Sequence, residues 1–279
     1  MYVINVRKDI MYKLIASDMD ETFLSSDHSL LKANIDTIKT LQDKGVWFVP
    51  SSGRPYWSIM ETFEPIKDII RDTYIVSFNG GCINKVGVDE PIYANELSFE
   101  HVEYLFKLGK KMGVGMHIYE LNGPCWGCDF IESEHAYLKG HMPVSIFESD
   151  NIDFLKDRPI AKMLYVKPDL KWLEKTSEEI DKTIEWGDTT ISANRYLEVN
   201  PKGVNKGTGL VKLAEILGID IADTIALGDS ANDNEMLEVA GLGIAVANAT
   251  QKTKSIADVV ADSTNDDAIL LEVLNKYID

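Results

Sequence analysis

The strongest constraint on the fold is a repeated alternation of short apolar runs with amphipathic helical patterns. Residues 13–18 contain an apolar run that stops abruptly at charged residues, which is typical of a buried strand. A helical pattern begins at Leu31, and residues 46–49 form a second apolar and aromatic run. A strand, helix, strand unit of this kind builds parallel sheets. The N-terminal part of the chain therefore predicts an open α/β sheet.

The first helix is supported by its periodicity and by its ends. Ser29 is a candidate N-cap, and Gly45 lies just beyond the last apolar position. The apolar positions recur at spacings of four and three, as expected for one buried helix face. They are Leu31, Ile35, Ile38 and Leu41.

The same alternation continues through a third strand at residues 74–78 and returns late in the chain. A second helix includes Leu210, Leu213, Ala214 and Leu217 and is closed by Gly218. Further strands are expected at residues 224–227, 242–247 and 258–261, followed by a closing helix at residues 268–277.

The sequence pattern of residues 83–195 differs from that of the flanking segments, because it contains many aromatic residues. We interpret these residues as an inserted α+β domain. Helices are expected at residues 100–112 and 170–184, and an alternating strand runs from Ile191 to Val199. The predicted fold class is α/β. A Rossmann-like, doubly wound parallel-sheet core is formed by residues 1–82 and 196–279, and the insertion interrupts it.

Composition narrows the possible functions. A chain of 279 residues with 45% apolar residues can bury a substantial core, and its net charge of −17 disfavours nucleic acid and anionic membranes as partners. We find no apolar run of transmembrane length and no secretory signal, so a cytoplasmic location is expected. Whether Met1 or Met11 is the native start stays open, and no pattern indicates the oligomeric state.

Two carboxylates, Asp18 and Asp20, follow the first predicted strand directly. Ligand sites of open parallel sheets lie at these strand ends, and crowded carboxylates favour a hard cation such as Mg²⁺. An acidic surface turn is the alternative interpretation. A second cluster, with Asp229, Asn232 and Asp233, follows the strand at residues 224–227. A helix N-cap is its alternative, but two clusters together indicate one shared metal site.

Two further segments carry groups suited to phosphate. Ser52, Gly53 and Arg54 follow the second predicted strand, where a hydroxyl and backbone N–H groups can hold phosphate oxygens. Lys206 lies among flexible residues before a helix and offers a positive charge. A polar turn and a solvated lysine are the alternatives for these segments when each is taken alone.

These four segments, in this order, resemble the four motifs of the haloacid dehalogenase superfamily, and most closely its Cof-like sugar-phosphate phosphatases. The motifs are Asp18-Met-Asp20-Glu-Thr22, Ser52-Gly53-Arg54, Gly203 to Gly207 around Lys206, and Gly228 to Asp233. Asn79-Gly80 and residues 243–248 also resemble that subfamily. Ser52 stands where threonine is common, which preserves the hydroxyl.

The resemblance implies a phosphatase of small phosphorylated metabolites. Asp18 would attack phosphorus to form an aspartyl-phosphate, and Asp20 would protonate the leaving oxygen and then activate water. Mg²⁺ would be held by Asp18, the Asp20 carbonyl and Asp229, while Ser52 and Lys206 hold the phosphoryl oxygens. The resemblance also places Asn232 and Asp233 as supports of that site. Candidate substrate contacts in the core are Thr22, Gly53, Arg54, Asn79 and Gly80.

The insertion occupies the position of the family's type II cap, which covers the site and selects the substrate. Candidate substrate contacts in it are Asn122, Trp126, Asn194 and Arg195, and ordinary packing or surface roles are the alternative for each. Cys125 and Cys128 form a Cys-x-x-Cys pair, which is compatible with a redox dithiol or half a zinc site. Only His117 and His135 lie near enough in the sequence to complete such a site.

Two rival functions stay open. A receiver-like phospho-acceptor module also uses acidic residues, Mg²⁺, a hydroxyl and a lysine, but it needs neither the cluster at Asp229 nor a long insertion. A phosphomutase of the same superfamily would return the phosphoryl group to the substrate instead of to water, and Asp20 and the cap decide between the two. The sequence does not identify the substrate.

Overall fold

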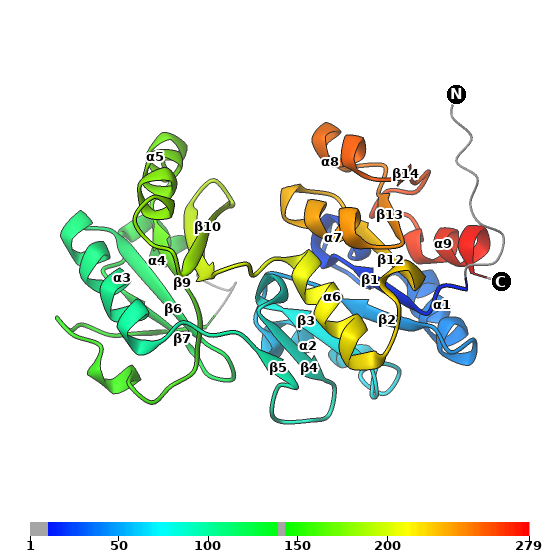
Figure 1. Cartoon of the computed structure of the whole chain (residues 1–279), viewed down its shortest axis with the longest axis horizontal. Helices are drawn as coiled ribbons and strands as arrows, with labels where there is room; N and C mark the ends of the chain where they lie inside the picture. The colour runs from blue at the N-terminus through cyan, green and yellow to red at the C-terminus, as the bar shows by residue number, and fades with distance from the viewer. Residues whose placement is uncertain (1–10, 139–142, 279) are drawn as a thin grey trace. The chain divides into compact units, whose positions relative to one another are not determined.

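The computed structural model of the chain describes residues 11–138 and 143–278 (Figure 1), so the choice between Met1 and Met11 concerns residues partly outside this description. The chain divides into two compact units. The core unit comprises the segment through Arg54 together with residues 58–89 and 205–279. The inserted unit comprises residues 55–57 and 90–204. The domain limits expected from the sequence, at residues 83 and 195, stay a prediction.

The core unit contains a parallel sheet of five strands in the order β14-β13-β12-β1-β2 (Figure 1). All four residues of β1 are buried, and its Ile15 lies in register with Phe48 of β2 on one side and Ile225 of β12 on the other. The predicted doubly wound α/β class is confirmed. The strands are β1 (Leu14–Ser17), β2 (Trp47–Pro50), β12 (Thr224–Gly228), β13 (Leu242–Ala245) and β14 (Val259–Val260).

The strand order reverses between β1 and β12. From β1 the chain moves outward to β2, whereas from β12 it moves outward in the opposite direction to β13 and β14. Ligand sites of open α/β sheets lie at the carboxyl ends of strands at such a switch point. The residues that follow β1 and β12 there are Asp18 and Asp229.

A short extension continues the core sheet beyond β2. A parallel bridge joins Ser51 to Val76 of β3 (Tyr74–Ser77), and β3 pairs antiparallel with β4 (Cys82–Lys85). This pairing explains why β4 groups with the core unit.

Helices pack on both sides of the core sheet. Helix α1 contacts α9, and α6 contacts α7. Because right-handed crossovers run outward in opposite directions from the switch point, these two pairs cover opposite faces. The helices are α1 (Lys32–Asp43), α2 (Tyr56–Phe63), α6 (Lys206–Leu217), α7 (Asn234–Val239), α8 (Gln251–Ile256) and α9 (Ile269–Tyr277).

The predicted N-cap of the first helix at Ser29 is wrong. Helix α1 begins at Lys32 after Leu31, which makes no side-chain capping hydrogen bond. The Ser29 hydroxyl instead lies 2.7 Å from the Ser25 hydroxyl, and the Ser29 carbonyl accepts a hydrogen bond from Ser25 N at 3.2 Å. Ser29 therefore belongs to a polar turn ahead of the helix.

The inserted unit is built on a sheet of six strands in the order β10-β11-β9-β6-β7-β8. All neighbouring pairs are antiparallel except β7 and β8. The elements of this unit are β5 (Tyr93–Ala94), α3 (Phe99–Met112), β6 (Gly115–Glu120), β7 (Cys125–Cys128), α4 (Glu132–Leu138), β8 (Val144–Ile146), β9 (Ile160–Val166), α5 (Leu170–Asp181), β10 (Gly187–Ser192) and β11 (Tyr196–Pro201).

The single strand predicted from Ile191 to Val199 is wrong, because a turn divides it. Strand β10 ends at Ser192, and β11 begins at Tyr196 and pairs back against it. Between them Ala193 and Asn194 have φ values of 50° and 49°, in the left-handed region. Apolar alternation on both sides of the turn made the two strands of this hairpin look continuous.

The two faces of the inserted sheet differ in character. One face carries Met116 of β6 and Leu197 of β11 into an apolar core shared with α3 and α5. The other face carries buried polar groups, among them His117, Lys162 and Glu198. Strand alternation produces this division, since neighbouring residues point to opposite faces. Each helix in the described part of the chain is too short or too polar to span a bilayer.

Gly80 generates a test of the core packing. The φ angle of Gly80 is 95°, and a Cβ added there would lie 2.1 Å from the carbonyl oxygen of Asn205. Asn205 is the residue that precedes Lys206 in the chain. Gly45 has a similar φ of 73° but no atom within 4 Å of an added Cβ. Alanine is strained at a positive φ, so each variant should lose about 1–2 kcal/mol of folding free energy from the backbone conformation alone. Gly80→Ala must also displace backbone, so it should lower the free energy of unfolding clearly more than Gly45→Ala in urea denaturation. Equal losses would contradict this packing.

Candidate active site

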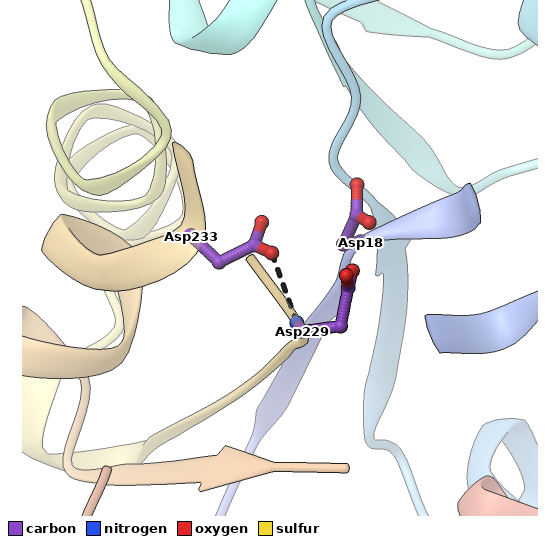
Figure 2. Close-up of side chains that lie close together, drawn as sticks. All are labelled: Asp18, Asp229 and Asp233. Carbon is purple, nitrogen blue, oxygen red and sulfur yellow. Dashed lines mark hydrogen bonds between the residues drawn. The ribbon is translucent and has the colours of Figure 1, made fainter. Parts of the chain in front are cut away.

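Three carboxylates converge at the switch point of the core sheet. Asp18 follows β1, Asp229 follows β12, and Asp233 ends the helical turn Ala231–Asp233. Figure 2 shows the three side chains approaching from these separate segments. One carboxylate oxygen from each lies within 4.8 Å of those of the other two. The two acidic clusters of the sequence therefore meet, at a spacing that one cation can bridge.

Lys206 joins two of these carboxylates. It is fully buried at the start of α6, and its Nζ donates to Asp233 Oδ1 at 2.6 Å and to Asp18 Oδ1. The helix start is fixed by Asn205, whose side chain accepts a hydrogen bond from Thr208 N at 2.8 Å. The capped start of α6 thus places the Lys206 ammonium group among the three carboxylates.

One lysine does not compensate three acids. Burial raises the pKa of Asp18 well above its ordinary value, although Lys206 opposes the shift. Burial and the nearby Asp233 carboxylate also raise the pKa of Asp229. Burial lowers the pKa of Lys206, but Asp18 and Asp233 outweigh this effect and raise it overall. The site therefore holds excess negative charge that a cation would relieve.

Both carboxylate oxygens of Asp233 already accept hydrogen bonds, so this residue supports the site and is less available as a metal ligand. Its Oδ2 accepts hydrogen bonds from the backbone N–H groups of Asp229 and Ser230, both at 3.0 Å, while Oδ1 accepts from Lys206. Asn232 Oδ1 accepts from the Ser230 hydroxyl at 2.8 Å. These bonds fix the loop after β12 and leave Asp18 and Asp229 as the more available carboxylates.

Thr22 and Asp20 occupy the turn that follows Asp18. The buried Thr22 hydroxyl donates to Asp229 Oδ1 at 3.0 Å, so it tethers the two acidic segments. Asp20 Oδ1 forms an ion pair with Arg54 Nη2 and lies 3.3 Å from His28 Nδ1. Between them, Glu21 has a left-handed φ of 57°, which lets the chain reverse sharply at this point.

Ser52 and Asn79 lie in adjoining turns after β2 and β3. Ser52 is buried, its hydroxyl accepts from Arg54 N at 3.2 Å, and its carbonyl accepts from Asn79 N at 2.9 Å. A Cβ on Gly53 would lie 3.0 Å from Asn79 Oδ1, so glycine lets the Asn79 amide approach. That buried Oδ1 has no hydrogen-bond partner among the described residues. Gly80 then packs against Asn205, as described above.

The candidate contacts in the inserted unit have partners of their own. Trp126 Nε1 donates to Glu120 Oε1, and its ring lies 4.9 Å from the Phe154 ring. Arg195 Nη1 pairs with the buried Glu134 at 2.8 Å. Asn122 and Asn194 are exposed, each in a turn between strands. Their roles as substrate ligands stay predictions.

The Cys-x-x-Cys pair does not form a dithiol or zinc site. Cys128 packs into the apolar core of the inserted unit, whereas Cys125 Sγ lies 3.4 Å from His117 Nδ1 on the polar face. Residues three apart on a strand point to opposite faces, which separates the two thiols. Burial raises the pKa of both thiols to about 12, which disfavours thiolate chemistry.

Sequence reasoning missed His28. It stands in the polar stretch after the first motif, where serine and aspartate neighbours are typical of a turn. No spacing rule distinguishes a histidine there from a solvated one. Only the path of the turn brings its ring to Asp20.

Comparisons with known proteins agree with this geometry. The haloacid dehalogenase-like hydrolase family matches residues 15–273. The 5-amino-6-(5-phospho-D-ribitylamino)uracil phosphatase YcsE of Bacillus subtilis is 29% identical, over 94% of this chain and 95% of that protein. An HMP-PP phosphatase of Yersinia pseudotuberculosis is 28% identical, over 88% of this chain and 87% of that protein. A haloacid dehalogenase-like hydrolase from Bacteroides thetaiotaomicron has a crystal structure with a TM-score of 0.78 and 29% identity, over 95% of this chain and all of that one.

The family match spans both parts of the core and the insertion between them. It confirms the resemblance to Cof-like phosphatases that the four motifs carry, and it confirms the enzyme class expected from them. The chain belongs to the haloacid dehalogenase-like hydrolase family, and its class is that of a phosphoric monoester hydrolase.

Proposed function

We propose that the protein is a Mg²⁺-dependent phosphatase of small phosphorylated metabolites that works through an aspartyl-phosphate on Asp18. The observation that carries the proposal is the contact of the buried Lys206 with Asp18 and Asp233, beside Asp229, at the switch point of the sheet. A nucleophilic carboxylate needs positive groups around it before it can accept an anionic phosphoryl group.

The residues present fit a magnesium ion. Asp18 and Asp229 offer oxygen ligands within 4.8 Å of each other, and their raised pKa values mark uncompensated charge. Mg²⁺ prefers such oxygen ligands. It would be held by these two carboxylates and the Asp20 backbone carbonyl. When bound, the ion supplies positive charge to the phosphoryl oxygens and to the crowded acids.

The proposed reaction has two steps. An Asp18 carboxylate oxygen attacks phosphorus, the bond from phosphorus to the ester oxygen breaks, and Asp20 gives that oxygen a proton. A water molecule then attacks phosphorus, the bond from phosphorus to the Asp18 oxygen breaks, and Asp20 takes a proton from the water. Inorganic phosphate leaves, and both carboxyl groups return to their starting state. Lys206 offsets negative charge on Asp18 in each step.

The turns after β2 and β3 are proposed to bind the phosphoryl group and its neighbourhood. The Ser52 hydroxyl accepts from Arg54 N, so its own hydrogen can be donated to a phosphoryl oxygen, and backbone N–H groups nearby can donate as well. The unpaired Asn79 amide oxygen would be satisfied by a donor on the substrate, such as a hydroxyl.

The substrate class is proposed from the charge pattern and the relatives. With a net charge of −17, an anionic substrate needs local positive groups, and Lys206 and Arg54 lie in the site segments. The relatives named above are phosphatases of a phosphoribitylamino-uracil and of HMP-PP, both small phosphorylated molecules. We infer sugar phosphates or similar metabolites, with the inserted unit acting as the cap that selects among them through residues such as Trp126 and Arg195.

A phosphomutase remains the second candidate, because it would use the same nucleophile and the same acid and base. Phosphate release distinguishes the two, since a mutase returns the phosphoryl group to the substrate. Purified protein should release phosphate from p-nitrophenyl phosphate with Mg²⁺ and not after chelation. A panel of sugar phosphates then ranks substrates by kcat/KM. Lack of Mg²⁺-dependent phosphate release would contradict the proposal.

Asp18→Asn should reduce kcat by on the order of 10⁴-fold or more, because the amide keeps the shape but is not a nucleophile. The fold should persist, since Lys206 keeps its bond to Asp233 and one buried negative charge is removed. Asp20→Asn should lose nearly as much activity. Steady-state kinetics, with thermal melting as the folding control, measures both effects. Full activity in the pure Asp18→Asn protein would remove the mechanism.

Mg²⁺ should stabilise the protein more strongly as the pH rises. A folded carboxyl group with a raised pKa keeps a proton that the unfolded chain has lost, so metal-free stability falls as pH increases above the ordinary value of 3.8 toward the raised one. The metal needs the deprotonated ligands. At about 100 times its Kd, Mg²⁺ should raise Tm by on the order of 5 °C near neutral pH and by less near pH 5.

The control for this measurement is a pair of aspartate variants. Asp229→Asn should lose the Mg²⁺-induced rise in Tm, whereas Asp157→Asn, at an exposed position, should keep it. An equal rise in wild type and Asp229→Asn would show that the ion binds elsewhere.

A further inference from the structure

We propose that His28, acting together with Arg54, is a positioning residue that holds the Asp20 carboxylate in the orientation needed for its proton transfers. The proposal rests on the proposed function, because it concerns the acid and base of that reaction. Both partners reach the same atom from separate segments. Arg54 Nη2 pairs with Asp20 Oδ1, and His28 Nδ1 lies 3.3 Å from that oxygen.

Arg54 is a fixed partner. Its backbone N–H donates to the Ser52 hydroxyl at 3.2 Å, and its carbonyl accepts from Phe78 N at 3.1 Å. The guanidinium also donates from Nη1 to Thr62 Oγ1 of α2 at 3.4 Å. These contacts tie the guanidinium to the turns after β2 and β3, so the ion pair places Asp20 relative to the proposed phosphate site.

His28 is presented by a turn that is itself hydrogen-bonded. His28 N donates to the Ser25 carbonyl at 2.7 Å, and the Ser25 hydroxyl donates to Asp27 Oδ1 at 2.6 Å. The His28 backbone has a left-handed φ of 61°, and its side chain is 65% exposed. A strained, well-tied turn that ends in an exposed imidazole contributes little to the core. Among the residues that the structure describes, its imidazole contacts Asp20, which favours a role in the site.

Two partners on one carboxylate oxygen have a geometric consequence. A single ion pair allows a carboxylate to rotate about its bond to Cβ, whereas contacts from two directions restrict that rotation. Both contacts involve Oδ1, so Oδ2 lies outside them and is the oxygen suited to exchange a proton with the leaving group and with water. Catalysis is sensitive to such placement, since shifts of about 1 Å can cost on the order of 100-fold in rate.

The test uses leaving groups of different acidity. An acid matters most when the departing oxygen is basic, so losing its alignment should penalise p-methoxyphenyl phosphate more than p-nitrophenyl phosphate. We expect His28→Ala to lower kcat/KM about tenfold for the methoxy ester and about twofold or less for the nitro ester. Both losses are smaller than the roughly 10²–10⁴-fold that acid–base catalysis contributes, because the acid itself is still present. The KM for each ester should change little, because His28 is not proposed to contact phosphate.

Matched variants separate positioning from general damage. His28→Gln keeps a side-chain N–H donor and should restore most of the activity toward the methoxy ester. Lys32→Ala removes an exposed charge that pairs with Asp36 and should leave both esters unaffected. The Tm of His28→Ala should match wild type within about 1 °C, as expected for an exposed side chain.

Three outcomes would overturn the proposal. These are an equal loss for both esters, no loss for either, or a glutamine variant as impaired as the alanine variant. If wild type releases no phosphate from either ester, the proposed function itself fails, and this proposal fails with it. Failure of the proposed function can be told apart from failure of the His28 proposal, because it is seen in the wild-type protein before any variant is compared.

Discussion

The site depends on the contact of the buried Lys206 ammonium group with two carboxylates. Removing an ammonium group from water is costly, and the cost is offset only when close partners receive its charge. Asp18 and Asp233 provide them, and Asp233 in turn accepts two backbone N–H groups of the loop after β12. The lysine therefore does more than neutralise an acid. It joins the residues that follow β1 and β12 to the start of α6, so it fixes the relative positions of the charged groups at the switch point of the sheet.

Much of this arrangement could be predicted from the sequence because it follows from strong local rules. Buried strands such as Leu14–Ser17 show as apolar runs, and a parallel sheet places their carboxyl ends at one edge. Asp18 and Asp229 could thus be expected to lie close together although no spacing rule relates them. The identity of Lys206 as the positive partner came from its motif, since a lysine before a helix is usually solvated.

The parts that could not be predicted depend on the path of turns. Ser29 has the right chemistry for an N-cap, but its hydroxyl bonds to Ser25 and the helix begins later. Asn194 interrupts what reads as one strand, because a left-handed pair of residues is compatible with the same apolar alternation. The ion pair between Arg54 and Asp20 was not foreseen either, and the substrate contact expected of Arg54 stays a prediction. Long side chains on loops have many reachable partners, and sequence spacing does not choose among them.

The hydrogen bond between Lys206 and Asp18 links residues that are 188 positions apart. During synthesis the N-terminal strand, its aspartates and the whole insertion emerge from the ribosome before β12 exists to pair with β1. A nascent chain that ends before Lys206 presents an acidic turn without its lysine or its second acidic segment, so the proposed site is incomplete. The order of the segments therefore postpones assembly of that site until the last quarter of the polypeptide has joined the sheet.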